Sequence, residues 1–193
     1  MTQDTNRAQH VYLVRHGQTA LNAEGRLRGL ANPPLDGIGL AEAKALAGVL
    51  AAKGPVRVVS SPLARAARTA GIIAEAAGVG CSVDERFNDR DYGPQTGNIK
   101  AEVIAQWGTV DDAPGVEPLE DVLARARPEL DALLDGPEGD PVIVVTHDAV
   151  IRPLIAELDS TKTGLEVPTG SWNDLVRVGG VWSVLAVDQK PRG

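Results

Sequence analysis

Three short apolar runs, each followed directly by polar residues, limit most strongly what this chain can fold into. They cover residues 11–14, 56–59 and 142–145, and each has the length and composition of a buried strand. Stretches with apolar residues at helical spacing separate these runs. Buried strands that alternate with helices form a parallel sheet covered on both faces. We therefore expect a three-layer α/β/α fold with a mostly parallel central sheet.

The remaining elements follow from periodicity and from the positions of glycine and proline. Helices are predicted over residues 38–53, 62–77, 99–107, 119–134 and 149–158. For the second of these helices, Ser61 and Pro62 provide an N-cap and a first-turn proline. Further short strands are predicted over residues 81–83, 175–178 and 182–187. Residues 84–97 are polar and lack a period, which predicts a long functional loop with at most one helical turn.

Length and charge bear on the class of protein. A chain of 193 residues suits one domain, which we expect over residues 1–193 with residues 1–9 as a flexible leader. Its 19 Lys and Arg residues stand against 26 Asp and Glu residues, a net charge of -7. Nucleic-acid-binding surfaces normally carry a basic surplus, because their affinity comes from neutralising phosphates. No run approaches the roughly 18 apolar residues of a membrane span. Neither nucleic acid nor a membrane is an expected partner.

The cysteine content and the first residues indicate the compartment. Cys81 is the only cysteine, which excludes an intramolecular disulfide and a cysteine metal cluster. The first residues are polar and lack the apolar segment of a secretion signal. We expect a cytoplasmic protein in which Cys81, within a predicted strand, is an inert core residue.

Side chains capable of chemistry follow all three apolar runs. Arg15 and His16 follow the first run, Arg65 lies shortly after the second, and His147 follows the third. Ligands of open parallel α/β sheets bind beyond the carboxyl ends of the strands. We therefore expect two histidines and two arginines to converge on one site.

Two imidazoles beside two guanidiniums favour a phosphate site over a metal site. Fixed positive charges weaken the binding of a metal cation to histidine, so we expect no metal and no cofactor. Arginine offers paired planar donors that match phosphate oxygens. Neighbouring arginines also keep a histidine neutral, which leaves a ring nitrogen free to attack phosphorus.

Several ordered motifs surround these residues. The first is Leu-Val-Arg-His-Gly-Gln-Thr at residues 13–19, the second covers residues 60–70, and the last is Val-Val-Thr-His at residues 144–147. Shorter matches lie at Asn22, Arg26, Gly29, Leu35, Gly39, Gly115 and Glu117. Together they resemble the signature of the histidine phosphatase superfamily, also called the phosphoglycerate mutase-like family, in its branch with Leu-Val-Arg-His-Gly. The resemblance implies a phosphoglycerate mutase-like form of the predicted fold.

The resemblance also implies roles for individual residues. It implies that His16 is the nucleophile that becomes phosphohistidine. The pocket for the transferring phosphoryl group is completed by Arg15, Arg65 and His147. Substrate contacts outside this centre are implied for Asn22, Gln18 and Thr19. Phosphoryl transfer needs mainly positioning and charge stabilisation, which agrees with these residue types.

Two aspartates compete for the role of general acid. The family's usual acid is a glutamate, and Asp89 aligns with it within residues 87–93. Aspartate is one methylene shorter, but a buried carboxyl with a raised pKa still protonates a leaving oxygen. Asp148 is the alternative, because it resembles the His-Asp pair of the superfamily's acid phosphatases, although a charge at a helix N-terminus would also account for it. We favour Asp89, whose loop matches the block of this branch.

The expected activity is hydrolysis of a small phosphomonoester in two steps through phosphohistidine on His16. Mutase-type phosphoryl transfer on the same site is the alternative, although the extra segments implied for true mutases find little room within residues 97–142. A non-catalytic phospholigand-binding protein is a further alternative. The arginines oppose a metal-dependent hydrolase using His16, His147 and Asp148. The sequence leaves the identity of the substrate and the oligomeric state open, and a dimer is one of the open alternatives.

Overall fold

A computed structural model describes residues 7–136 and 139–191. In these ranges one sheet has six strands in the order β3-β2-β4-β1-β5-β6. The strands are β1 (Gln9–Arg15), β2 (Arg57–Ser60), β3 (Cys81–Val83), β4 (Val142–Thr146), β5 (Trp172–Val178) and β6 (Val181–Gln189). Strands β1 to β4 pair in parallel, whereas β5 and β6 are antiparallel additions at one side. The mostly parallel sheet expected from the apolar runs is therefore confirmed.

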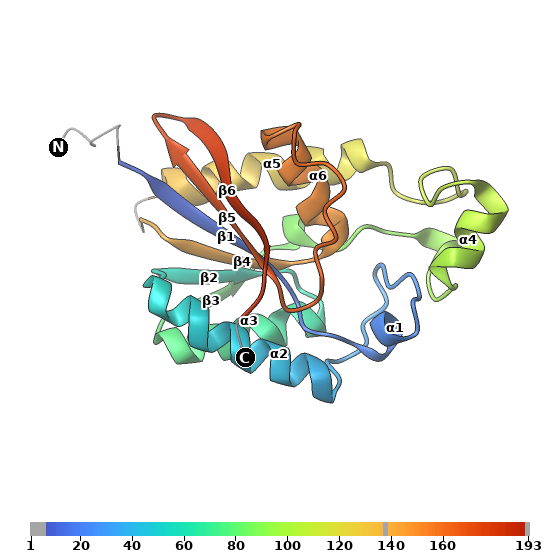
Figure 1. The fold of residues 1–193 in the computed structure, drawn as a ribbon, viewed down its shortest axis with the longest axis horizontal. Coiled ribbons are helices and arrows are strands. Elements are labelled where there is room, and N and C mark those ends of the chain that lie inside the picture. Colours follow the sequence, from blue (N-terminus) through green and yellow to red (C-terminus); the bar gives the residue numbers. More distant parts are fainter. Residues whose placement is uncertain (1–6, 137–138, 192–193) are drawn as a thin grey trace.

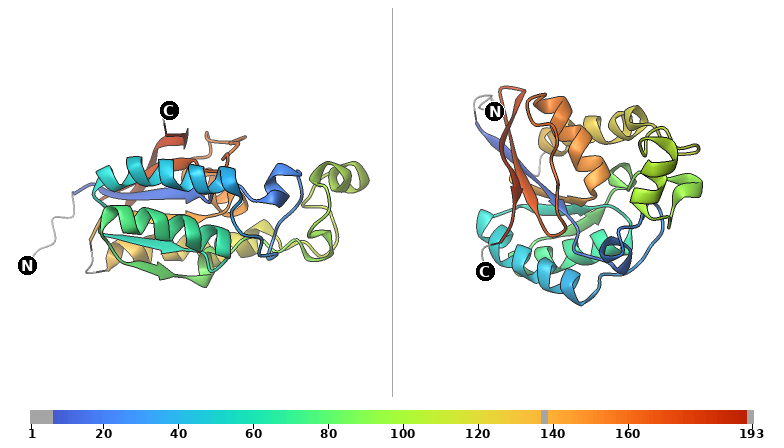
Figure 2. Two further views of the ribbon diagram at one scale, coloured as in Figure 1. Left: turned by 90° about the horizontal axis from the view of Figure 1, so that it is seen from below. Right: turned by 45° about the vertical axis from the view of Figure 1, so that its right-hand side comes forward.

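Helices cover both faces of this sheet, as Figures 1 and 2 show. The helices are α1 (Ala20–Ala23), α2 (Gly37–Leu50), α3 (Ala64–Ala77), α4 (Lys100–Trp107), α5 (Leu119–Asp135) and α6 (Asp148–Leu158), with short 3-10 turns η1 (Ala51–Lys53), η2 (Glu85–Phe87) and η3 (Gly93–Gln95). One core cluster joins α2 and α3 to the sheet through Leu46, Leu50 and Ile73. The other joins α5 and α6 to the opposite face through Leu130 and Ile151. The three layers follow from these two apolar interfaces.

The parallel register aligns the ends of the three central strands. Arg15 pairs with Thr146, and Ser60 pairs with Val145 on the other side of β4. The residues that follow β1, β2 and β4 therefore emerge at one edge of the sheet. Helices α1 and α4 lie beyond this edge, away from the remaining helices (Figure 1).

Several boundaries differ from the sequence predictions. Helix α3 begins at Ala64, two residues late, and its N-cap residue is Leu63, whose apolar side chain makes no cap hydrogen bond. The Ser61 hydroxyl lies outside the helix, where it contacts both the Leu63 N–H and His147. The 84–97 loop holds two 3-10 turns rather than at most one. Cys81 is exposed, since β3 is an edge strand, so the prediction that it is a core residue is wrong.

The predictions of a single domain, a flexible leader and no membrane span have different outcomes. One domain over residues 1–193 stays a prediction. Residues 1–6 of the expected leader lie outside the described residues, and β1 already begins at Gln9. In the described part of the chain, no helix has both the length and the apolar content needed to cross a bilayer.

Close backbone packing fixes the loop that follows His16. A Cβ atom on Gly17 would lie 2.3 Å from the Gly39 carbonyl oxygen, and one on Gly39 would lie 2.1 Å from the Gln18 carbonyl oxygen. Neither backbone can move aside, since Gly39 lies in the first turn of α2 and its N–H donates to Asp36 at 2.8 Å. Only glycine permits this approach.

Gly39→Ala is expected to destabilise the protein by about 1–3 kcal/mol, the usual cost of overpacking against fixed atoms, and to lower activity by displacing His16. Gly48→Ala is the matched control on the same helix, because a Cβ there meets nothing within 4 Å. It is expected to raise stability by about 0.5–1 kcal/mol through helix propensity. Urea unfolding of both variants measures the difference. Equal effects at the two positions would contradict the packing explanation.

Candidate active site

His16 lies directly after β1 and is fully buried. Its Nδ1 lies 2.6 Å from the Gly17 carbonyl oxygen, which can only accept, so Nδ1 carries the ring proton. Nε2 presents its lone pair and accepts the Arg65 Nε–H at 3.2 Å. Burial, together with the adjacent His147 and Arg65, holds the pKa of His16 well below its ordinary value. The geometry thus provides a neutral imidazole whose Nε2 carries no proton, which a nucleophile needs.

Arg65, in the first turn of α3, is also fully buried and is held on three sides. Its Nη1 donates to the Ala31 carbonyl oxygen at 2.8 Å. Its Nη2 donates to the Gly29 carbonyl oxygen at 2.9 Å and to Asp89 Oδ2 at 2.8 Å. A guanidinium fixed in this way needs no reorganisation to stabilise charge on a phosphoryl group.

His147 follows β4, and its ring centroid lies 5.1 Å from that of His16. Its Nε2 lies 2.8 Å from Ser61 Oγ, and Ser61 Oγ in turn accepts the Leu63 N–H at 3.3 Å. When the Ser61 hydroxyl donates to Nε2, the ring proton sits on Nδ1. This Nδ1 is buried without a hydrogen-bond partner in the described part of the chain and lies 3.4 Å from Asp89 Oδ2. His147 therefore presents one unused donor to the centre.

Asp89 lies in the loop after η2, with 2% of its surface exposed. Its Oδ2 contacts Arg65, and its Oδ1 accepts the Arg90 N–H at 2.8 Å. Burial raises the pKa of Asp89 above its ordinary value, although Arg65 opposes the shift. A carboxyl that keeps its proton to higher pH suits a general acid.

Arg125 of α5 holds the backbone of this loop. Its Nη1 donates to the Asn88 carbonyl oxygen at 2.8 Å, and its Nη2 donates to the Asp89 carbonyl oxygen at 3.1 Å. Its Nε donates to Glu117 Oε1 at 3.1 Å, which fixes the guanidinium. The carboxyl of Asp89 is thus positioned from a helix far along the chain, which the sequence pattern did not reveal.

Asp148, the other predicted candidate, sits among three guanidiniums. Arg28 Nη2 donates to its Oδ1 at 2.9 Å, Arg15 Nη2 lies 3.5 Å from the same oxygen, and Arg152 Nη2 lies 3.4 Å from Oδ2. Burial by itself would raise the pKa of Asp148, but these arginines hold it well below its ordinary value. Asp148 is therefore ionised, whereas Asp89 is the carboxyl that burial favours in its neutral form.

Arg15 completes the group of predicted residues around the two histidines. It is buried and donates through Nη1 to the Val167 carbonyl oxygen at 2.6 Å. Arg28 was missed by sequence reasoning, although it lies between two of the shorter matches, Arg26 and Gly29, and its basic side chain was the available signal. Arg68, one turn after Arg65, is exposed.

Three predicted substrate contacts take part in local structure instead. Thr19 is the buried N-cap of α1, and its N–H and Oγ1 both donate to Asn22 Oδ1, at 3.0 and 2.8 Å. Gln18 Nε2 donates to Asp36 Oδ2 at 3.0 Å. These bonds shape the turn after His16, and the roles of the three residues in substrate binding stay predictions.

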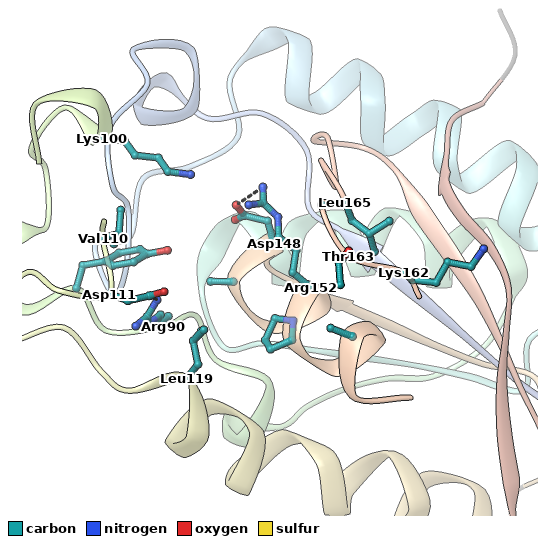
Figure 3. Close-up of a pocket in the computed structure, with 15 residues that line it drawn as sticks. Arg90, Lys100, Val110, Asp111, Leu119, Asp148, Arg152, Lys162, Thr163 and Leu165 are labelled. Carbon is teal, nitrogen blue, oxygen red and sulfur yellow. Dashed lines mark hydrogen bonds and ion pairs between the residues drawn. The ribbon is translucent and has the colours of Figure 1, made fainter. Parts of the chain in front are cut away.

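A cavity of about 430 Å³ opens beside Asp148 (Figure 3). Its lining mixes basic and apolar side chains, among them Lys100, Arg152, Val110, Leu119 and Leu165. Lys100 points across the cavity toward Asp148, whereas Lys162 points away (Figure 3). A second, more open cavity of about 600 Å³ is bordered by Asp89 and by acidic residues, Glu85, Asp91 and Glu117.

Comparison with known proteins shows which family has this arrangement of two histidines, arginines and a buried aspartate. The family model for the histidine phosphatase superfamily (branch 1) matches residues 11–189. The chain belongs to this superfamily. The phosphoglycerate mutase-like fold and the Leu-Val-Arg-His-Gly resemblance are thereby confirmed.

The similar members of the histidine phosphatase superfamily are named for different activities. Bifunctional protein Rv2228c of Mycobacterium tuberculosis is 38% identical over 153 residues, 74% of this chain and 42% of that protein. The chain thus spans less than half of that relative. A 2,3-bisphosphoglycerate-dependent phosphoglycerate mutase of Methylobacterium is 36% identical over 180 residues, covering 82% of this chain and 86% of the mutase. The structure of a mycobacterial glucosyl-3-phosphoglycerate phosphatase with VO3 has a TM-score of 0.80 at 28% identity, covering 94% and 100% of the two chains.

Proposed function

We propose that this histidine phosphatase superfamily member hydrolyses a small phosphomonoester through a phosphohistidine intermediate on His16. The carrying observation is the pair of hydrogen bonds on the His16 ring, with Nδ1 donating to the Gly17 carbonyl and Nε2 facing the Arg65 guanidinium. Nε2 attacks phosphorus in line with the leaving oxygen. Arg15, Arg65 and the free Nδ1–H of His147 stabilise charge on the phosphoryl oxygens.

The carboxyl group of Asp89 transfers a proton in both steps. Asp89 donates its proton to the leaving oxygen, and the resulting carboxylate then accepts a proton from the water that cleaves phosphohistidine. Inorganic phosphate leaves, and both His16 and Asp89 return to their starting forms. The 430 Å³ cavity beside Asp148 takes the leaving group, which meets both apolar side chains and the Lys100 ammonium there.

Several finer properties belong to the same proposal. The arginines around His16 and His147 disfavour a metal cation, so the reaction is expected to proceed without one. The lone Cys81 agrees with a cytoplasmic location. The net charge of -7 disfavours nucleic acid as a partner, and the oligomeric state is left open.

Phosphoglycerate mutase activity is the second candidate, because a named mutase is 36% identical over 82% of the chain. A mutase must keep water from its phosphoenzyme until the group returns to another hydroxyl. Here α4 and α5 are joined by residues 108–118, with no further helix or strand between them, and the cavity bordered by Asp89 is open. Hydrolysis is therefore ranked first.

The proposal predicts phosphate release from an aryl phosphate in the presence of EDTA. Radiolabelled substrate followed by an alkaline quench, under which phosphohistidine survives, is expected to leave label on the protein. Phosphoglycerate supplied with its bisphosphate is expected to lose phosphate rather than to isomerise. Isomerisation faster than hydrolysis would select the mutase. Loss of activity with EDTA that returns on adding metal would refute the metal-free mechanism.

A further inference from the structure

The buried carboxylate of Asp148 is outnumbered by the guanidiniums that contact it. Arg15, Arg28 and Arg152 all approach its two oxygens, at 3.5, 2.9 and 3.4 Å. In the part of the chain that the structure describes, no other carboxylate forms an ion pair with any of the three. One negative charge is therefore shared by three positive charges, next to the pair of histidines. Such a local excess of positive charge favours the binding of an anion.

Arg28 belongs spatially to the phosphoryl site. The neighbouring Gly29 carbonyl oxygen accepts the Arg65 Nη2–H at 2.9 Å, so one stretch of backbone holds both arginines. Arg28 Nη2 and Arg15 Nη2 approach the same oxygen, Asp148 Oδ1, at 2.9 and 3.5 Å, so the two guanidiniums are neighbours and Arg15 directly precedes His16. Arg28 is 9% exposed, and its Nε is buried without a hydrogen-bond partner among the described residues. Buried donors are normally satisfied, so this N–H, like the Nε–H of Arg15 beside it, is available to a ligand.

We propose that Arg28 contacts the substrate at the phosphoryl site and that Asp148 is its positioning residue rather than a proton donor. The inference rests on the proposed phosphatase function and adds a further guanidinium to Arg15 and Arg65. Asp148 Oδ1 holds Arg28 from one side, while the Arg26 carbonyl oxygen accepts its Nη1–H at 3.2 Å from the other. The guanidinium is thereby fixed before substrate arrives.

The alternative is that the Arg28–Asp148 ion pair only stabilises the fold. Buried ion pairs contribute little net stability, because desolvation of both charges offsets their attraction. A merely structural pair also needs one arginine, not three. The ionised state of Asp148, surrounded by these charges, likewise leaves it without a proton to donate.

Arg28→Gln, Asp148→Asn and the double variant test the proposal. Arg28→Gln is expected to lower kcat/KM by about tenfold to a hundredfold and to raise the inhibition constant of inorganic phosphate by a similar factor, the usual loss for a charge-assisted hydrogen bond. Asp148→Asn is expected to lower kcat/KM equally for aryl and alkyl phosphates. The double variant is expected to lose less than the product of the two single losses, because Asp148 acts partly through Arg28.

Controls separate these effects from unfolding. Arg68→Gln, which removes an exposed arginine of α3, is expected to leave both constants unchanged. Arg28→Lys retains the charge and is expected to recover part of the loss, which keeps the test usable if the Asp148 variant folds poorly. Thermal unfolding midpoints are measured for every variant.

Two results would overturn the inference. An unchanged inhibition constant of phosphate in a folded Arg28→Gln protein would remove Arg28 from the site. A loss in Asp148→Asn confined to alkyl phosphates would make Asp148 the proton donor. If the wild-type protein releases no phosphate from any tested ester, calorimetric binding of orthovanadate to wild type and Arg28→Gln still tests the contact, so failure of the phosphatase proposal remains distinguishable.

Discussion

His16→Ala is expected to abolish turnover, with kcat lower by about 10⁴-fold or more, the loss typical of a deleted nucleophile. No neighbouring nitrogen replaces it. His147 turns its Nδ1 toward Asp89 and its Nε2 toward Ser61, away from the centre, and Arg65 is a cation without a lone pair to donate. Phosphate release from an aryl phosphate measures the loss, and the label trapped by alkaline quench is expected to disappear with it.

His10→Ala is the matched control for this variant. His10 lies on the same strand, β1, but its Nδ1 pairs with Asp174 at 2.9 Å and it lies outside the motif that contains His16. Its replacement is expected to leave turnover unchanged. Both variants are compared by thermal unfolding. Appreciable turnover by a folded His16→Ala protein would sink the phosphohistidine mechanism.

Asp89→Asn is expected to show a loss that depends on the leaving group. Alkyl phosphates need their leaving oxygen protonated, so their kcat is expected to fall by about 10²–10⁴-fold, the usual contribution of a general acid. The aryloxide of an aryl phosphate leaves as a stable anion, so aryl phosphates are expected to lose little in the first step. Asparagine keeps the shape and still accepts a hydrogen bond from Arg65. The comparison of kcat for a series of leaving groups measures the effect.

The pH profile provides an independent readout of Asp89. The general acid must be protonated, and burial raises the pKa of Asp89. Activity toward alkyl phosphates is therefore retained below this raised pKa and falls as pH rises through it. In Asp89→Asn this alkaline limb is expected to vanish for the residual activity. A wild-type profile without such a limb would argue against Asp89.

Asp91→Asn is the matched control, because Asp91 lies two residues further along the same loop and is exposed. It accepts the Gly93 N–H at 2.7 Å, a bond that asparagine also makes. Its leaving-group dependence is expected to equal that of the wild type. Selectivity between aryl and alkyl esters that appears in Asp148→Asn, and not in Asp89→Asn, would transfer the role of the acid to Asp148.

The predicted strands explain how much of the site could be seen in the sequence. Each of the three valine-rich runs ends in polar residues, and parallel pairing requires that such ends meet at one edge of the sheet. That rule predicted from the sequence that Arg15, His16 and His147 lie close together. Arg65 followed because its helix starts at the same edge.

Other features lay beyond any local pattern. The apolar residue types around Cys81 predicted a core strand, but whether a strand is central or at an edge depends on the order of pairing along the whole chain. The N-cap of α3 was mispredicted as well, because the helix begins at Ala64 and the Ser61 hydroxyl, besides accepting the Leu63 N–H, contacts a histidine 86 residues away. Long-range contacts of this kind override local preference.

The sequence by itself determined the α/β class, the superfamily and the residues expected to bind the phosphoryl group, because apolar periodicity and short motifs are local properties of the chain. Only the tertiary structure decided how the two aspartates differ. Asp89 and Asp148 are chemically identical, and their proton affinities depend on the charges that folding places around them. Asp148 meets three arginines from three separate segments, whereas Asp89 is buried against Arg65 and His147. A carboxyl's surroundings are a property of three-dimensional packing.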